Sequence, residues 1–545
     1  MHLKNKSVLL ILKVLPLLLA VLIMVPRLTS AQFGLLDDGY IMNEVKAILD
    51  GDLNMLLGHE AGRFRPVYWL YFTLIYAIAG PNPFWFYIGH LIILLILIVE
   101  IQTLMKHQGV NHVHILLATL VFIFSIPIIE NFYTLSKGEP LQLVFILASI
   151  LCLEKQKAKI NHRMSWVLRA LTIITLIIAF WTKETAYIML PLSALWAAYA
   201  LIQRNRISIE ERKAYLHYLG ATLIATVVNV LIFTVLNVSL ASGDSYTSQY
   251  ELDVISILTR APRWMTLYVH YFSFLLPLAI MVVIIFLNKE NENKQLTHNL
   301  VFWGSWILAW SIGLMPWQFA ESYYLLPFSV GVSILIALLI PHIWDGINSH
   351  RPLIHRLMTT MAVICLVLLL ASLTHYRTHA RVQLTFDRMN DQMINTIRNL
   401  LPDDGDLIMG VNTYNEYVQN TGHFLIDQDG MTNITFDFVS LEVLLVLETR
   451  SEAILLLPYI EHQPTLLLRA GVEEEFTMAW VDEIQQTLEG RLEPVDQLRA
   501  GFQINNINLP VIACPILGRR GFCEHPDPFL DTRLFSYGWD IYRIK

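Results

Sequence analysis

Two adjacent carboxylates, Asp37 and Asp38, follow the first long apolar run of the chain, which extends from about Val8 to Val25. Lysines precede and begin this run, and positive charges mark the cytoplasmic end of a membrane span. The two acids are therefore predicted to lie on the non-cytoplasmic side. A carboxylate there can take a proton from a weakly nucleophilic hydroxyl. Asp37 could instead bind a divalent metal ion, and no other cofactor is indicated. The alternative to both is an ordinary solvated loop.

The same predicted side collects four basic side chains that could hold an anion: Arg63, Arg65, Lys137 and Lys183. An arginine offers a flat fork of donors, whereas a lysine offers a compact charge. Cations of both kinds stabilise the negative charge of a phosphate leaving group. Other roles are open, because the two arginines could contact lipid headgroups and Lys183 could snorkel or form a local ion pair with Glu184.

Six further residues are candidates for substrate binding because they also lie on the predicted outer side. They are Glu60, Tyr68, Glu139, Glu184, Glu321 and Tyr324. For Glu139 and Glu321 the alternative role is helix capping or a solvated helix end.

The composition is that of an integral membrane protein. The 545 residues are 55% hydrophobic and 15% charged, whereas about a quarter of a soluble protein is charged. The net charge of −7 does not indicate a nucleic-acid partner. Cys152 and Cys365 lie in apolar runs and are predicted to be packing residues. Cys514 and Cys523 lie in a polar region, and they could form a disulfide if that region is exported.

Apolar runs of roughly spanning length occur at eleven places. They are Val8–Val25, Phe84–Leu104, His114–Ile129, Pro140–Leu153, Trp166–Trp181, Thr185–Ile202, Leu216–Val238, Met265–Leu287, Asn299–Pro316, Tyr323–Ile340 and Leu357–Leu373. A twelfth run, Pro66–Ala79, is short and aromatic. Counted as a span, it would place the basic cluster Lys155–Arg163 outside. Treated as a helix in the outer interface, it leaves that cluster inside, and the positive-inside rule strongly favours this second interpretation.

The character of the chain changes at about Thr374. Strand-like runs at 407–411 and 453–457 alternate with helical patterns at 387–400 and 473–488, which predicts a small α/β domain. We therefore expect a transmembrane domain of about eleven helices at 1–373, with an outer loop at 26–83 that carries the acidic pair. Residues 374–545 would form an extracytoplasmic domain of a multi-pass protein in the inner or plasma membrane.

Four motifs, in this order, resemble those of the GT-C glycosyltransferases, and above all the branch with protein O-mannosyltransferases (dolichyl-phosphate-mannose-protein mannosyltransferases) and lipid A aminoarabinose transferases. They are the acidic pair with Arg63-Phe64-Arg65-Pro66-Val67-Tyr68-Trp69, then Ser136-Lys137-Gly138-Glu139-Pro140-Leu141, Trp181-Thr182-Lys183-Glu184-Thr185 with Leu190-Pro191, and Tyr324-Leu325-Leu326-Pro327. The chain departs from the pattern at Glu184, where glycine is usual, and at Tyr323, where arginine is usual. Arg63 and Arg65 replace a more common lysine.

The resemblance, which covers about 8–373, implies a GT-C fold and an inverting hexosyl- or pentosyltransferase that uses a sugar on a polyprenyl phosphate. Asp37 would be the base, with Asp38 as the alternative, and the four cations would hold the donor phosphate. The acceptor would be a hydroxyl of a glycan, a lipid or a protein.

Three other interpretations remain open. One is an O-antigen ligase or polymerase, which would depend on arginines in a large outer loop. A lipid-linked glycan transporter or flippase would place polar groups in mid-span, whereas here they gather at span ends. The third is a structural membrane protein without catalysis.

Overall fold

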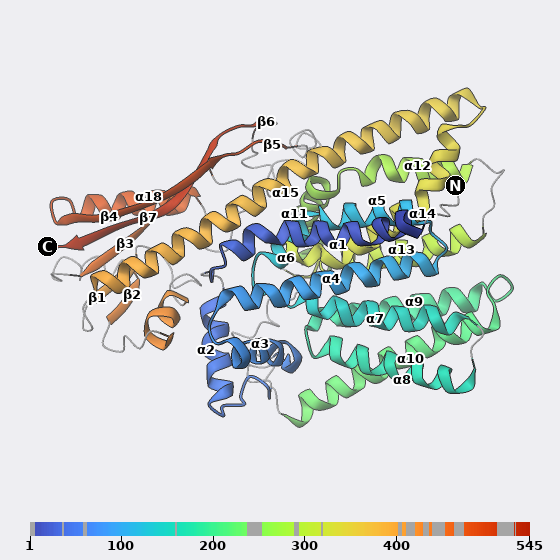
Figure 1. Ribbon diagram of the computed structural model, residues 1–545, viewed down its shortest axis with the longest axis horizontal. Helices are drawn as coiled ribbons and strands as arrows, with labels where there is room; N and C mark the ends of the chain where they lie inside the picture. Colours follow the sequence, from blue (N-terminus) through green and yellow to red (C-terminus); the bar gives the residue numbers. More distant parts are fainter. Residues whose placement is uncertain are drawn as a thin grey trace.

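The computed structural model describes residues 6–34, 37–57, 63–158, 161–236, 253–287, 294–317, 320–401, 406–409, 420–428, 435–438, 453–462, 474–508, 528 and 530–545. Figure 1 shows long helices aligned in a bundle, with a small sheet domain beyond one end. The helical elements of the bundle are α1 Lys6–Thr29, α2 Asp38–Leu49, α3 Pro66–Ala79, α4 Pro83–His107, α5 His112–Ile123, α6 Ile126–Phe132, α7 Glu139–Lys157, α8 His162–Phe180, η1 Glu184–Ile188, α9 Met189–Ile202, α10 Ile209–Val235, α11 Val254–Phe272, α12 Leu275–Leu287, α13 Lys294–Ile312, η3 Ser322–Leu325, α14 Leu326–Ile347 and α15 Pro352–Leu400.

Helices lie at all eleven predicted spans. In the described part of the chain, seven are long and apolar enough to cross a membrane, and the number rises to nine if each bent pair counts as one span. The bent pairs are α5 with α6, at 59°, and α11 with α12, at 80°. The other two predicted spans form α7 and α13, which are 19-residue helices with polar or charged residues at their ends. The prediction of a polytopic helical membrane protein is confirmed.

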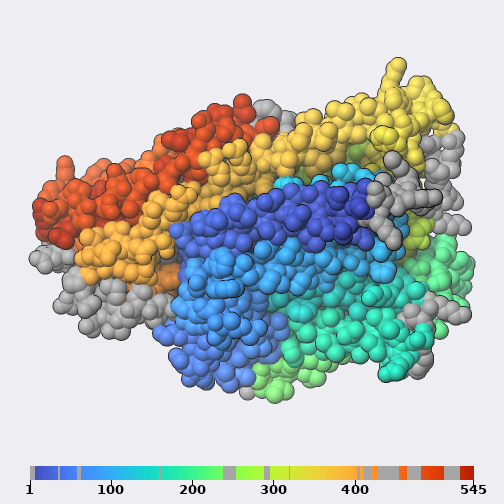
Figure 2. All heavy atoms as spheres, in the orientation of Figure 1, coloured from blue at the N-terminus to red at the C-terminus, as the bar shows by residue number. Residues whose placement is uncertain are grey.

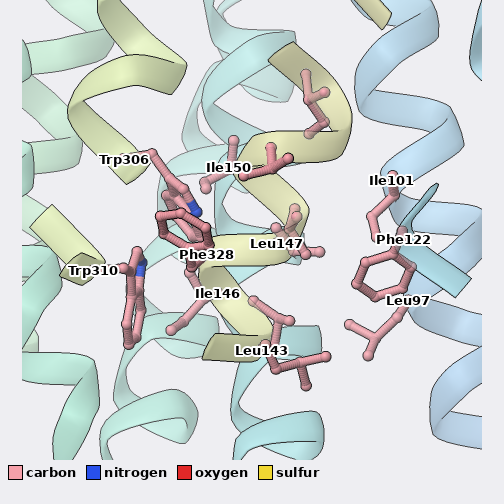
Figure 3. Close-up of a cluster of buried hydrophobic side chains, with 14 of the residues drawn as sticks. Leu97, Ile101, Phe122, Leu143, Ile146, Leu147, Ile150, Trp306, Trp310 and Phe328 are labelled. Carbon is pink, nitrogen blue, oxygen red and sulfur yellow. The ribbon is translucent and has the colours of Figure 1, made fainter. Parts of the chain in front are cut away.

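The core of the bundle is apolar and aromatic. In Figure 3 the side chains of Trp306 and Trp310 on α13 lie to one side of Phe328 on α14, while Leu97 and Phe122 lie to the other. All five are buried. Burying such side chains supplies the main favourable term within the bundle through close packing.

Two short helices lie at the end of the bundle that faces the sheet domain. In Figure 1, α2 runs across the direction of the bundle helices. The apolar run Pro66–Ala79 forms a separate 14-residue helix, α3, as predicted from its length. Proline fits its first turn because that position needs no backbone donor. It buries Tyr68, Trp69 and Phe72 and ends at Gly80, which has a φ of 66°.

The C-terminal region forms a mixed sheet with the strand order β2-β1-β3-β7-β4. β1 pairs in parallel with β2 and β3, whereas β7 is antiparallel to β3 and β4. The predicted strands at 407–411 and 453–457 correspond to β1 and β3, so the small α/β domain is confirmed. The elements are β1 Asp406–Met409, η4 His423–Gln428, β2 Thr435–Phe438, β3 Ile454–Glu461, α18 Glu474–Thr487, β4 Leu492–Gln503, β5 Asn506–Ile507, β6 Leu530–Asp531 and β7 Leu534–Ile544.

One continuous helix of 49 residues, α15, joins the bundle to this domain. The predicted boundary at 373/374 falls inside it, because the sequence holds no glycine or proline between Pro352 and Pro402 that would end a helix. The C-terminal half of α15 packs into the core of the sheet domain. There the Asn390 side chain accepts hydrogen bonds from Tyr537 Oη at 2.9 Å and Trp539 Nε1 at 3.0 Å. Figure 2 shows the sheet domain lying along the C-terminal half of this helix.

We expect Asp52 and Lys155 to lie on opposite sides of the membrane. Asp52 follows α2, whereas Lys155 lies near the far end of α7, whose 19 residues span about 28 Å. Single cysteines at these exposed positions, in a background with the native cysteines replaced, should react with an impermeant thiol reagent from opposite faces. Labelling from the same face would overturn the predicted topology.

Candidate active site

Two lysines and two aromatic rings meet where α7, η1 and η3 begin. Lys183 Nζ lies 2.5 Å from Glu139 Oε1, and both side chains are almost fully buried. The same ammonium lies 5.0 Å from the centre of the Tyr324 ring. Lys137 Nζ lies 4.2 Å from the centre of the Tyr323 ring. Burial lowers the pKa of Lys183, while the Glu139 and Glu184 carboxylates oppose that shift.

The arginines reach the same place from the start of α3. The Arg63 Nε atom lies 4.0 Å from Glu184 Oε1, and the Arg65 guanidinium lies 4.5 Å from the centre of the Tyr68 ring. Two hydrogen bonds fix this helix start. Val67 N donates to Trp181 O at 3.1 Å, and Tyr68 Oη donates to Ser136 O at 3.0 Å. The segments before η1 and α7 are thereby held against the arginines. We name the set Arg63, Arg65, Lys137, Glu139, Lys183, Glu184 and Tyr323 the cation cluster.

The two acids of the pair face different surroundings. Asp37 is partly exposed and has a left-handed backbone, with φ 62° and ψ −18°, which aspartate tolerates better than most residues. Its charge acts on the Tyr323 phenol together with the charges of Glu139 and Glu321. Asp37 precedes α2, which packs against α3 through Tyr40 and Trp69, whose ring centres lie 5.9 Å apart. That Asp37 and the cation cluster form one site stays a prediction.

Asp38 instead points into the protein and is 2% exposed. Its carboxylate accepts a hydrogen bond from Gly34 N at 2.7 Å. Burial raises the pKa of Asp38 to about 8, and the Asp387 charge adds to the shift, while the Gly34 hydrogen bond and Arg27 oppose it. Asp38 is therefore protonated at neutral pH, and a protonated carboxyl is no base.

The neighbour of Asp38 is a buried ion pair that the sequence did not reveal. Arg27 Nη2, at the end of α1, lies 2.7 Å from Asp387 Oδ2 on α15, and both side chains are at most 1% exposed. Arg27 also donates to the backbone oxygen of Gln32 at 3.0 Å and to the Tyr87 hydroxyl. Gln383 donates to the same Asp387 oxygen at 2.9 Å. We name Arg27, Asp387 and Asp38 the buried junction.

Most of the predicted basic and aromatic site residues lie close together. Asp38 and Glu60 are exceptions. Tyr68 and Tyr324 face cations of the cluster, and Glu321 acts on Tyr323 electrostatically. Asp38 belongs to the buried junction. Glu60 lies outside the described residues, as do Cys514 and Cys523. Tyr323, which stands where the resembling family has arginine, offers its ring to Lys137 and Lys183.

The described residues around Asp37 do not suit a divalent metal ion. Such an ion prefers several oxygen ligands, but the adjacent acid, Asp38, is buried and its carboxylate accepts a hydrogen bond from Gly34 N. Nowhere in the described ranges do three or more His, Cys, Asp or Glu side chains form a group that could hold a metal. We therefore derive no step that uses one.

We expect Asp38→Asn to reduce the loss of stability on raising the pH. The folded state keeps the Asp38 proton up to about pH 8, whereas the unfolded chain releases it near pH 4. Between these values the folded state binds more protons, so stability falls by up to about 1.4 kcal/mol per pH unit through this group. As the pH rises from 5 to 7.5, the melting temperature of Asp38→Asn should increase relative to that of the wild type. Asp52→Asn, on an exposed loop, is the control. Parallel curves for wild type and Asp38→Asn would mean that Asp38 is ionised in the folded protein.

No family model and no curated protein matches the chain. Solved structures that it resembles include ArnT from Cupriavidus metallidurans bound to undecaprenyl phosphate, which is 11% identical with a TM-score of 0.48 and covers 81% of this chain and 92% of that chain. The apo oligosaccharyltransferase from Archaeoglobus fulgidus is 11% identical with a TM-score of 0.49, and the match covers 91% of this chain and 70% of that chain. Both structures are 11% identical to this chain with TM-scores below 0.5, so nothing about this chain is concluded from them.

Proposed function

We propose that this protein is an integral membrane glycosyltransferase. It would move a sugar from a polyprenyl-phosphate carrier to a hydroxyl of a glycan, a lipid or a protein on the non-cytoplasmic face. The observation that carries the proposal is the cation cluster at one end of the helical bundle, with Asp37 at the start of α2, the helix that packs against α3. A transferase of this kind needs both features in one place, because it must activate a hydroxyl and release an anionic phosphate.

In the proposed reaction the Asp37 carboxylate takes the proton of the acceptor hydroxyl as the oxygen attacks the anomeric carbon. The bond from that carbon to the phosphate oxygen breaks, and its electron pair leaves with the polyprenyl phosphate. Attack from the face opposite the leaving group inverts the anomeric centre.

Lys137 is the best placed cation for the leaving phosphate. Lys183 is paired with Glu139, and Arg63 lies near Glu184. Lys137 is partly exposed and faces the Tyr323 ring. Among the described residues no carboxylate pairs with it, so a phosphate can approach its ammonium without first displacing an acid. A ring face holds a cation without neutralising it.

We expect Lys137→Gln to weaken binding of polyprenyl phosphate by about 10- to 100-fold, the value of one hydrogen bond to a charged group. The measurement is the dissociation constant for polyprenyl phosphate together with the rate of sugar transfer by the purified protein. Lys46→Gln, which removes an exposed lysine of α2, is the control. Equal affinity in Lys137→Gln and wild type would remove Lys137 from the phosphate site.

The wild-type assay itself tests the proposal. Transfer requires that polyprenyl phosphate is released in step with a glycosylated acceptor. Cells without the gene should accumulate a polyprenyl-phosphate sugar, which identifies the donor. A transporter would move the lipid-linked sugar across vesicle membranes and release no polyprenyl phosphate.

A further inference from the structure

The start of α2 has an unusual arrangement around Asp37. An aspartate that precedes a helix commonly accepts a hydrogen bond from the backbone of the first turn. Within the described part of the chain, the Asp37 side chain makes no such bond. Its left-handed backbone, with φ 62°, also differs from the extended conformation of an ordinary capping residue.

The missing acceptor comes from the C-terminal region, 380 residues further along the chain. Tyr40 N, in the first turn of α2, donates to Asn420 Oδ1 at 2.9 Å. Asn420 is 1% exposed. It stands at the start of a helical segment that continues into η4, where Phe424 contacts Phe33 with ring centres 5.7 Å apart. The Asn420 amide is therefore held in place by packing between the C-terminal region and the acidic loop.

A glycine permits this contact. A Cβ atom added to Gly39 would lie 2.9 Å from Asn420 O, a distance that real Cβ atoms essentially never show, and 3.0 Å from Asn420 Oδ1. Glycine inside a helix is unfavourable. Its presence in the first turn of α2 is explained by the close approach of Asn420.

We propose that Asn420 caps α2 in place of Asp37, and that it is thereby a positioning residue for the transfer reaction. The cap satisfies the helix start from another part of the chain, so the Asp37 carboxylate is not drawn onto its own helix and stays available to the acceptor hydroxyl. The inference rests on the proposed function for its catalytic part, while the cap itself does not depend on it.

The test compares Asn420→Ala with Asn420→Asp in the full-length protein. Asn420→Ala removes the acceptor, so we expect amide exchange in the peptide 37–42 to become about five- to tenfold faster. We also expect kcat to fall by about tenfold or more with the KM for the donor little changed, because a displaced base affects the reaction step more than donor binding. Asn420→Asp keeps an oxygen acceptor beside a helix start that favours negative charge, and it should restore both readouts.

A pair of glycine variants supplies the matched control. Gly39→Ala should reproduce the effects of Asn420→Ala because its Cβ would displace Asn420. Gly220→Ala, on α10, adds a Cβ with no heavy atom within 4 Å, and it should leave exchange and kcat unchanged. Wild-type exchange in Asn420→Ala would overturn the cap. Faster exchange with an unchanged kcat, or a loss that Asn420→Asp does not restore, would overturn the positioning role. If the wild type transfers no sugar, the proposed function fails while the exchange experiment still decides the cap.

Discussion

Asp37→Asn should lower the rate of sugar transfer by about 10²- to 10⁴-fold, the usual contribution of a general base. The change is nearly isosteric and removes the charge that accepts the proton. Because Asp37 is partly exposed and lies outside the buried junction, the variant should fold and melt like the wild type. The measurement is transfer from a polyprenyl-phosphate sugar by the purified protein.

Two matched variants separate catalysis from a general effect of charge. Asp52→Asn removes a carboxylate from the exposed loop after α2 and should keep full activity. Asp38→Asn should keep most of its activity at neutral pH, because the carboxyl that it replaces is already protonated there. Full activity in Asp37→Asn would mean that the acid is a solvated loop residue, and the mechanism proposed here would then be wrong.

Arg27→Gln should destabilise the protein by about 3–5 kcal/mol, since it leaves a buried carboxylate without its partner. Asp387→Asn should cost less. Removing the Asp387 charge also removes one cause of the raised pKa of Asp38, so Asp38 can ionise more easily and serve as the counter-ion of Arg27. The double variant should therefore be more stable than Arg27→Gln alone.

Thermal unfolding in detergent measures the relative stabilities of these three variants. Arg388→Gln, which removes an exposed cation next to Asp387 on α15, should change stability by no more than about 0.5 kcal/mol. Equal losses in Arg27→Gln and Asp387→Asn would show that Asp38 does not substitute for Asp387. Additive losses in the double variant would show that the two residues are not coupled.

The sequence predicts the helices well because apolar length and charge asymmetry are local properties of the chain. It separates Pro66–Ala79 from the spans for the same reason. It does not predict the 80° bend between α11 and α12, because the overall hydropathy of Met265–Leu287 is the same whether the run is straight or bent, although Ser273 and Pro277 lie close to the bend. It also places a domain boundary at Thr374, where apolar residues give way to polar ones although the helix continues.

The site is predicted in part. Lys137, Lys183 and the arginines stand at span ends on one predicted side, so their convergence follows from topology. The buried junction does not follow, because Arg27 at the end of a span has the sequence pattern of an ordinary flanking charge. Its partner Asp387 lies 360 residues away, and no local pattern links the two. The same holds for Asn420, whose partner is a backbone amide.

Because α15 is one continuous helix, it limits how the C-terminal sheet domain can be exchanged between proteins. A helix of 49 residues is about 74 Å long and turns about 100° with each residue. One residue added between the bundle and Asp387 would therefore rotate everything beyond it by more than a quarter of a turn. A chimaera joined within α15 keeps its two halves in the same relative orientation only if the residues inserted or removed make up whole helical turns. Seven residues, which make nearly two turns, are the smallest close fit.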